Sequence, residues 1–327
     1  MKAFVTGGTG FIGGHIVRKL RSRGDDVVAL VRSREKAGEI AALGCTLVEG
    51  DLSDKEHLRK SMAGCDTVFH IAAVYKVGIP KSECPQMHEV NVAGTERTLD
   101  AAIAAAVSKI VYVSTVGYFG NTGGDVVDET YQRTPGNWAS CYDETKYKAH
   151  EVAKRRIAQG APIVIAQPGG VYGPGDHSEI GNFVMQMATG KLKFMTFPGV
   201  GFNLAHVDDI SDGIILAHDK GTIGESYVFG GEISTLGDLV KTAARITGRK
   251  PPRITMPAFM VKASIPMAPV VTKVMGLPPN LRELIKASDG VTYWATDAKA
   301  RRELGYSARS LEEGLRQTLA ALDKDAS

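Results

Sequence analysis

Apolar residues follow two alternating periods through the first half of the chain. Short runs rich in β-branched and aromatic side chains predict strands, and the stretches between them carry apolar residues every three or four positions, as helices with one buried face do. The expected strands are Ala3–Val5, Val27–Val31, Cys45–Glu49, Thr67–Ile71, Ile110–Val113 and Ile163–Ala166, and the clearest helices are Lys55–Met62, Val90–Ala106 and Tyr142–Gln159. This alternation predicts an α/β fold, a doubly wound parallel sheet covered by helices on both faces.

The alternation stops after Gly173. The segment Pro174-Gly175-Asp176 ends a strand, and methionine-rich helical stretches follow it. Ala205–Ile210 predicts a strand that returns to the sheet, and Tyr227–Gly230 predicts a strand at its edge. From Ser234 to Pro279 the chain is helical, apolar and interrupted by prolines, which favours a smaller, mostly helical lobe that is discontinuous in sequence.

A glycine-rich turn links the first strand to the first helix. It reads Thr6-Gly7-Gly8-Thr9-Gly10-Phe11-Ile12-Gly13. Such a turn needs glycine where the backbone bends, where it approaches a ligand and where helix meets sheet, and Gly7, Gly10 and Gly13 have these positions. The helix N-terminus then presents unpaired N–H groups to an anion, which predicts a dinucleotide pyrophosphate. The alternative is a glycine-rich turn that binds no ligand.

The length of 327 residues suits a nucleotide-binding domain with a smaller partner. We expect a dinucleotide-binding Rossmann domain over residues 1–172, to which residues 205–230 return. Residues 173–204 and 231–295 would form the discontinuous substrate-binding lobe, and residues 296–327 a C-terminal helical tail.

The end of the second strand predicts which dinucleotide is bound. An NAD site usually has an acid here for the ribose 2′-hydroxyl, whereas this chain has Arg32, followed by Arg34 and Lys36. An arginine pairs with a 2′-phosphate, so NADP(H) is preferred and NAD(H) remains possible. The alternative is a solvated basic loop. After the third strand, Asp51 and Leu52 are expected at the adenine.

Tyr142 and Lys146 form a Tyr-x-x-x-Lys pair at the start of a helix, where fourfold spacing puts both side chains on one face. A free phenol has a pKa of ~10 and acid–base work favours ~7, a difference of about 4 kcal/mol that nearby cations could supply. Ser114 and Thr115 end the preceding strand with hydroxyls that could hold a carbonyl oxygen.

These motifs together resemble the extended short-chain dehydrogenase/reductases, over nearly the whole chain. The matching segments are the glycine turn, Gly50-Asp51-Leu52, His70-Ile71-Ala72-Ala73, Asn91-Val92-Ala93-Gly94-Thr95, Ser114-Thr115, Tyr142 with Lys146, Pro168–Asp176 and His206-Val207-Asp208-Asp209. The resemblance implies Thr115, Tyr142 and Lys146 as catalytic residues. It implies cofactor contacts by Gly7, Thr9, Gly10, Phe11, Ile12, Arg32, Asp51, Leu52, Ala72, Ala73, Lys146, Pro168, Gly170 and Val171, and a structural role for residues 206–209.

Within the family the chain is most similar to the dihydroflavonol-reductase-like branch. The resemblance therefore implies an NADPH-dependent reductase of a ketone or aldehyde, with Tyr142 as proton donor. Gln167 departs from the arginine that is common there. Sugar-nucleotide enzymes of the family usually place an arginine shortly before the His-Val-Asp-Asp segment, whereas Gly201–Ala205 holds no cation. Lys191 and Lys193 weaken this argument, because either could reach the site.

An apolar pocket is expected from the methionine and phenylalanine content of the second lobe. The residues are Met185, Met187, Phe194, Met195, Phe197, Met256, Phe259, Met260 and Met267, about half of which we expect in the lobe's own core. Two alternatives remain, a nucleotide-sugar epimerase/dehydratase with tightly bound NAD(P) and a non-catalytic NADP(H)-sensing protein.

Composition limits the partners. A net charge of +3, without basic runs interleaved with aromatics, argues against nucleic acid. The four cysteines lack metal spacing and suggest reduced thiols in the cytoplasm. Met256–Pro279 contains lysines and prolines, so no transmembrane segment is expected, although this stretch could lie on a membrane surface. The expected partner is a small carbonyl substrate, and a homodimer is one option for the assembly.

Overall fold

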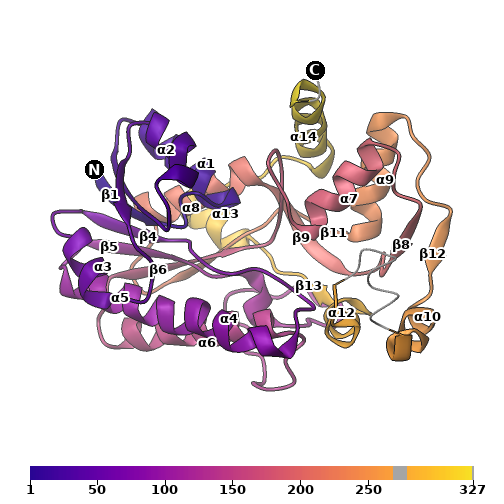
Figure 1. Cartoon of the computed structure of the whole chain (residues 1–327), viewed down its shortest axis with the longest axis horizontal. Coiled ribbons are helices and arrows are strands. Elements are labelled where there is room, and N and C mark those ends of the chain that lie inside the picture. The colour runs from indigo at the N-terminus through magenta and orange to yellow at the C-terminus, as the bar shows by residue number, and fades with distance from the viewer. Residues whose placement is uncertain (268–277, 326–327) are drawn as a thin grey trace.

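The computed structural model describes residues 1–267 and 278–325. A large sheet with helices on both faces makes up one half of the molecule, and a smaller lobe faces the carboxyl ends of its strands (Figure 1). No helix in these two ranges is both long enough and apolar enough to cross a membrane.

The large sheet has seven parallel strands in the order β10-β6-β5-β4-β1-β2-β3. Their bounds are β1 (Lys2–Thr6), β2 (Asp26–Val31), β3 (Thr46–Glu49), β4 (Thr67–His70), β5 (Lys109–Val113), β6 (Ile163–Pro168) and β10 (Ser226–Phe229). The strand order runs outward in both directions from β1, so the loops after β1 and β4 diverge and leave a crevice at the carboxyl edge. This topology confirms the predicted doubly wound fold.

Side chains alternate between the two faces of the sheet, and each face buries its own core. Ala3 and Val5 point to one face, which is covered by α1 (Phe11–Ser22), α2 (Gly38–Ala42), α8 (Val207–Asp219) and α13 (Ala298–Leu304). Phe4 points to the other, which is covered by α3 (Lys55–Ser61), α5 (Gly94–Ala104) and α6 (Cys141–Ala158). Shorter helical elements in this half are Glu35–Ala37, Lys81–Glu83, α4 (Cys84–His88), the π-helical Glu89–Ala93 and Val116–Phe119.

The smaller lobe combines two small sheets with helices. One sheet contains β7 (Gly170–Tyr172), β9 (Gly201–His206), β11 (Glu232–Thr235) and β13 (Thr292–Tyr293), and the other pairs β8 (Phe194–Thr196) with β12 (Ile254–Met256). The helices are α7 (Glu179–Ala188), α9 (Leu236–Thr247), α10 (Ala258–Ala263), the short Ile265–Met267, α12 (Leu281–Ser288) and α14 (Leu311–Asp325). α14 packs on α9 and β9, so this last helix is part of the smaller lobe, whereas α13 packs on the large sheet.

The structure corrects one predicted element. The expected strand Ala205–Ile210 is wrong, because β9 ends at His206 and α8 begins at Val207. The His206 imidazole accepts a hydrogen bond from the Asp208 N–H, and two aspartates in the first turn suit a helix N-terminus. Moreover, β9 pairs within the small sheet. The predicted edge strand at Tyr227–Gly230 is confirmed by β10, and residues 268–277 of the apolar stretch lie outside the described ranges.

The His206–Asp209 segment connects three parts of the fold. Asp208 lies 2.9 Å from His15 on α1 through Oδ1 and Nδ1. Asp209 accepts hydrogen bonds from the guanidinium of Arg309, which precedes α14, at 2.7 to 3.0 Å. These contacts hold α8 between the nucleotide-binding half and the C-terminal helix.

Candidate active site

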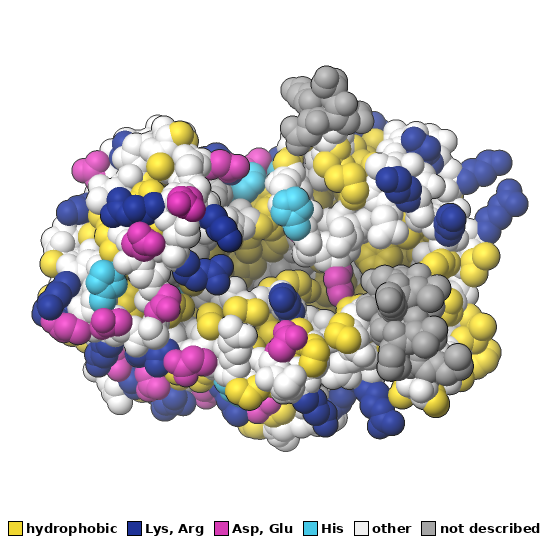
Figure 2. Space-filling model, in the orientation of Figure 1, with side chains coloured by type: hydrophobic (Ala, Val, Ile, Leu, Met, Phe, Trp, Pro, Cys, Tyr) yellow, Lys and Arg dark blue, Asp and Glu magenta, His cyan; other side chains and the backbone are white. Residues whose placement is uncertain are grey.

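A cleft of about 1720 Å³ lies between the carboxyl edge of the large sheet and the smaller lobe. Figure 2 shows the surface hollowed along the same line. The predicted site residues all line it: Gly7, Thr9, Gly10, Phe11, Ile12, Arg32, Asp51, Leu52, Ala72, Ala73, Thr115, Tyr142, Lys146, Pro168, Gly170 and Val171. The fold therefore brings together residues that lie up to 164 positions apart, while their individual roles stay predictions.

The glycine turn has the geometry of an anion-binding site. Gly7 has a φ of +76°, and a Cβ there would lie 2.7 Å from the Ala72 nitrogen. A Cβ on Gly13 would lie 2.0 Å from the Gly7 carbonyl oxygen, so the helix packs on the turn too closely for a side chain. Gly10 is the N-cap of α1, with no side-chain cap and no acid in the first turn. The backbone N–H groups of the first turn of α1 therefore have no side-chain partner, and with the positive end of the helix dipole they face the cleft. This arrangement suits a pyrophosphate.

The far end of the cleft carries opposite charges. Arg32 is exposed and follows β2, and no acid stands in its place at the strand end. Asp51 accepts hydrogen bonds from the Ser53 N–H and hydroxyl at 2.8 and 2.5 Å. These bonds lower the pKa of Asp51, with smaller effects of Arg97 and Arg32. Asp51 is thus an ionised acceptor beside a cation that could pair with phosphate.

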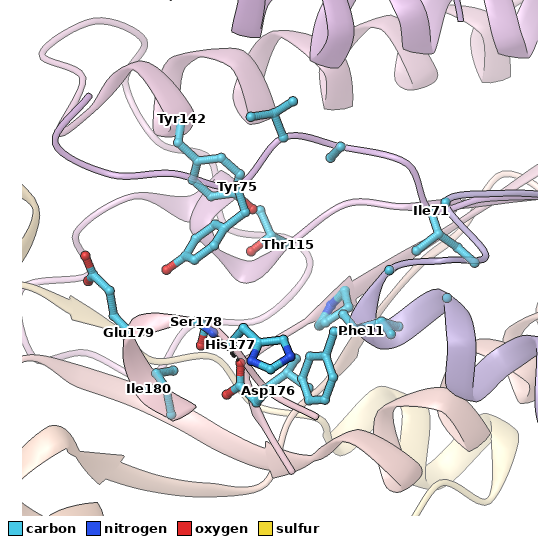
Figure 3. Close-up of a pocket in the computed structure, with 18 of the residues that line it drawn as sticks. Phe11, Ile71, Tyr75, Thr115, Tyr142, Asp176, His177, Ser178, Glu179 and Ile180 are labelled. Carbon is cyan, nitrogen blue, oxygen red and sulfur yellow. Dashed lines mark hydrogen bonds between the residues drawn. The ribbon is translucent and has the colours of Figure 1, made fainter. Parts of the chain in front are cut away.

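Two hydroxyl side chains meet where β5 and α6 approach each other. Ser140 caps α6 by accepting from the Asp143 N–H at 3.0 Å, which places Tyr142 in the first turn and Lys146 one turn later. Thr115 follows β5, and its Oγ1 accepts from the Gly117 N–H at 3.1 Å, so its proton is available to a ligand. Figure 3 shows Tyr142 and Thr115 on the same side of the cleft.

Burial sets the protonation of the two α6 residues. It raises the pKa of the Tyr142 phenol, and the adjacent Thr115 hydroxyl opposes this rise. Lys146 donates to the Val113 carbonyl at 3.0 Å. The lowered phenol pKa expected from Lys146 together with an oxidised nicotinamide stays a prediction. Lys146 is 4% exposed, and burial lowers its pKa to about 8. The Tyr142 phenol is therefore neutral at neutral pH.

Ser114 and His70 have structural partners. Ser114 Oγ lies 2.8 Å from Nδ1 of the buried His150, so Thr115 is the hydroxyl better placed for a ligand. His70 is 1% exposed, lies between the Thr6 and Thr95 hydroxyls, and has a pKa lowered by burial to about 3. Gln167 is 1% exposed, and its Nε2 has no hydrogen-bond partner among the described residues. Nothing in the structure explains the replacement of the family's arginine there.

The sequence did not indicate several residues at the substrate end of the cleft. The Tyr75 ring packs edge-on against the Tyr142 ring, with centroids 4.7 Å apart. Across the cleft, His177 and Glu179 come from the loop and first turn of α7, and His177 points toward Phe11 (Figure 3). Tyr75 follows the predicted Ala72-Ala73 contact by two residues, and only this proximity could have suggested it.

The apolar wall differs from the expected one. Among those proposed methionine and phenylalanine residues whose side chains the structure describes, only Phe194 and Phe197 line the cleft. Met187 and Met195 are in the lobe core, Met256 packs near α12, Met185, Phe259 and Met260 are exposed, and the Met267 side chain lies outside the described part of the structure. The predicted methionine-rich pocket is therefore wrong. Rings and aliphatic side chains form the wall instead: Phe183, Leu192, Phe202, Leu236, Leu284 and Tyr293.

A parallel sheet, a glycine-rich phosphate turn and a Tyr/Lys pair in one cleft define an NAD(P)-dependent oxidoreductase of the short-chain dehydrogenase/reductase type. Residues 3–230 match the NAD dependent epimerase/dehydratase family. The chain belongs to this family, which confirms the resemblance seen in its motifs.

Known relatives cover almost the full length. A putative dihydroflavonol 4-reductase of Synechocystis is 32% identical over 95% of this chain and 92% of that protein. A 4-hydroxy-2-methyl-3-oxo-4-farnesyl-3,4-dihydroquinoline-1-oxide ketoreductase of Stigmatella aurantiaca is 30% identical, covering 94% and 92%. The solved UDP-glucose 4-epimerase of Thermotoga maritima, with UDP-glucose, is 25% identical and covers 100% of both chains, with a TM-score of 0.82.

Proposed function

We propose that the protein is an NADPH-dependent reductase of a ketone or aldehyde with largely apolar substituents. The observation that carries this proposal is the pair of hydroxyls on Tyr142 and Thr115, side by side at the inner end of a cleft whose outer wall is aromatic and aliphatic. Such a wall suits an apolar substrate, and the hydroxyl pair suits a carbonyl oxygen.

Each residue of the site has a chemical role in this proposal. The Thr115 hydroxyl donates a hydrogen bond to the carbonyl oxygen of the substrate and so orients the substrate. This direction is favoured because the Thr115 oxygen already accepts a hydrogen bond from the Gly117 N–H. Tyr142 is neutral, because burial raises its pKa, and it transfers its proton to the oxygen as negative charge develops there. Lys146 contributes a charge near the phenol and a donor for the nicotinamide ribose. A bound reduced nicotinamide supplies the hydride.

The cofactor assignment rests on the two ends of the cleft. The uncapped N-terminus of α1 suits the pyrophosphate, and Arg32 suits a 2′-phosphate, for which an acid would be repulsive. Calorimetric titration of NADPH and NADH tests the preference. Tighter binding of NADPH is expected, and equal or reversed affinities would contradict it.

The apolar substrate is supported by the wall residues and by the name of the Stigmatella relative, whose substrate carries a farnesyl chain. The alternative, a nucleotide-sugar epimerase or dehydratase, is favoured by Lys191 and Lys193, which line the outer cleft and could pair with a diphosphate. Aryl ketones, aldehydes and steroid-like ketones should be compared with UDP- and GDP-sugars, with NADPH consumption and product measured separately. Conversion of a nucleotide sugar without net NADPH use would favour the alternative.

Variants of the hydroxyl pair test the chemistry. Tyr142→Phe should lower turnover by about 10²- to 10⁴-fold while NADPH affinity stays close to that of the wild type, because only the proton donor is lost. Lys146→Ala should lower both the turnover and the affinity for NADPH. Tyr75→Phe is the matched control, since it removes a neighbouring phenol and keeps the ring that packs against Tyr142. Substantial turnover by Tyr142→Phe would rule out Tyr142 as the proton donor. If the wild-type protein binds NADPH but reduces no carbonyl compound, a non-catalytic sensing protein is favoured.

A further inference from the structure

The outer edge of the small lobe exposes large apolar side chains. Ile254 on β12 is 63% exposed, and Phe259 and Met260 on α10 are 68% and 49% exposed. The opposite side of α10 is buried, since Val261 belongs to the same apolar cluster as Leu281 of α12. The exposed face of α10 and β12 is therefore an apolar surface on an element that is anchored to the lobe.

Basic side chains border this apolar surface. β8 and β12 are parallel, and Ile254 lies opposite Phe194, so the preceding residues, Arg253 and Lys193, are also neighbours. The guanidinium of Arg249 lies beside the turn before Lys191, because a Cβ on Gly190 would be 2.8 Å from its Nη1. We call the exposed residues Lys191, Lys193, Arg249, Lys250 and Arg253 the basic rim.

The two segments that form this edge of the lobe carry charge of one sign. The sequences 180–207 and 239–282 contain ten lysines and arginines and no aspartate or glutamate, so the rest of the chain is net acidic. Within residues 1–267 and 278–325, Lys241 pairs with Asp238 of its own helix, Arg245 with Glu312 and Lys262 with Asp289, whereas no residue of the basic rim pairs with an acid. Figure 2 shows basic side chains at the end of the molecule where Figure 1 places β8 and β12, with hydrophobic ones below them.

We propose that the small lobe docks on an anionic lipid bilayer through Ile254, Phe259 and Met260, with the basic rim at the level of the head groups. An apolar face bordered by lysine and arginine is the combination that binds such an interface, since apolar side chains enter the acyl boundary and long basic side chains reach the phosphates. A second copy of the chain would bring two cationic edges together. A nucleic acid would leave the apolar side chains without a partner.

The apolar surface lies beside the outer end of the cleft, so docking on a bilayer would bring the cleft entrance close to apolar compounds in the membrane. Lys191, Leu192, Lys193 and Phe194 line the cleft and lead directly into β8, which pairs with β12. The outer end of the cleft thus opens beside the docking surface, and an apolar compound could pass from the bilayer into it. Docking itself does not depend on the proposed function, because it is measured without substrate or cofactor.

The test is cosedimentation of the full chain with vesicles of phosphatidylcholine alone or with phosphatidylserine. Binding is expected only to the anionic vesicles, and high salt should reduce it through screening. The variant Arg249→Ala/Lys250→Ala/Arg253→Ala should bind roughly a hundredfold more weakly, since each basic residue near an anionic surface contributes roughly fivefold. Phe259→Ser/Met260→Ser should also lose binding while NADPH affinity and turnover in solution are kept, because neither residue lines the cleft.

Two control variants remove an equal number of basic residues and an exposed apolar side chain elsewhere on the surface. Lys60→Ala/Arg155→Ala/Arg302→Ala removes three exposed basic residues from α3, α6 and α13, and Ile223→Ser removes an exposed apolar side chain. Both should bind vesicles as the wild type does. The proposal is overturned if the wild type ignores anionic vesicles, if the controls weaken binding as much as the rim variant, or if duplex DNA or RNA displaces the protein and the serine variant binds the nucleic acid unchanged.

Discussion

Replacing Gly13 by alanine tests the packing that forms the cofactor turn. A Cβ at this position would lie 2.0 Å from the Gly7 carbonyl oxygen and 2.7 Å from its carbonyl carbon, both of which are backbone atoms. Real Cβ atoms stay 3.0 Å or more from such neighbours, so the start of α1 must move by roughly 1 Å. The fully buried Ile16 and Leu20 on the same helix oppose this movement.

The cost can be compared with a neighbouring glycine. Overpacking a well-packed site costs about 1–3 kcal/mol, and we expect Gly13→Ala to lower the free energy of unfolding by about 2 kcal/mol. Gly14 is also buried in α1, but a Cβ there would lie 3.7 Å from the nearest atom, the Gly8 oxygen, which is ordinary contact. Since glycine inside a helix is about 1 kcal/mol less favourable than alanine, Gly14→Ala should stabilise the protein by up to that amount.

Urea unfolding followed by circular dichroism, without cofactor, measures both variants. The two should differ by about 3 kcal/mol. NADPH titration should then show weaker binding for Gly13→Ala only, because the N–H groups of the first turn move with the helix. Equal stability of the two variants would refute the packing argument. Unchanged NADPH affinity in a destabilised Gly13→Ala would show that this turn does not hold the pyrophosphate.

Three further predictions concern charge. Arg32→Asp should reverse the preference between NADPH and NADH, measured by titration, and an unchanged ratio would show that Arg32 does not contact the 2′ position. In the folded protein the pKa of His70 is about 3, below its value of ~6.5 in the unfolded chain. Because the unfolded chain then binds a proton that the buried imidazole does not, the free energy of unfolding should fall as pH drops below ~6.5, by about 2 kcal/mol near pH ~5. His70→Gln should flatten this dependence in unfolding measured across pH, and an identical slope would contradict it. Asp209→Ala should destabilise the protein by about 3 kcal/mol by leaving the guanidinium of Arg309 unpaired, whereas Arg302→Ala, which breaks an exposed pair, should have almost no effect in the same assay.

The cofactor half of the fold was predictable because its signals are local. The central strands of the large sheet, β1, β2, β4, β5 and β6, are buried on both faces, so each reads as an apolar run. The glycine turn follows β1 directly in sequence. The carboxyl ends of parallel strands meet at one edge, so residues after β1, β2, β3, β4 and β5 could be assigned to one site without coordinates.

The predictions failed where an element's partner lies far away in sequence. The pattern of Ala205–Ile210 suits a strand or a helix start, and the cap by His206 decided between them at Val207. A high methionine content suits an apolar pocket and a core equally well. Met187 and Met195 are instead part of an apolar cluster that also contains residues of α9 and α14. A local sequence pattern does not show such a cluster.

Local sequence signals therefore suffice to predict the doubly wound sheet, the glycine turn, the basic residue that follows β2 and the Tyr/Lys pair, since each depends on neighbours within one turn or strand. Three features depend on packing between distant segments: the side chains that form the apolar wall of the cleft, the contact of Tyr75 with Tyr142, and the proximity of Lys193 and Arg253 just before β8 and β12. These contacts join segments 60 or more residues apart, and their geometry follows from the packing of the whole lobe, which periodicity along the chain does not encode.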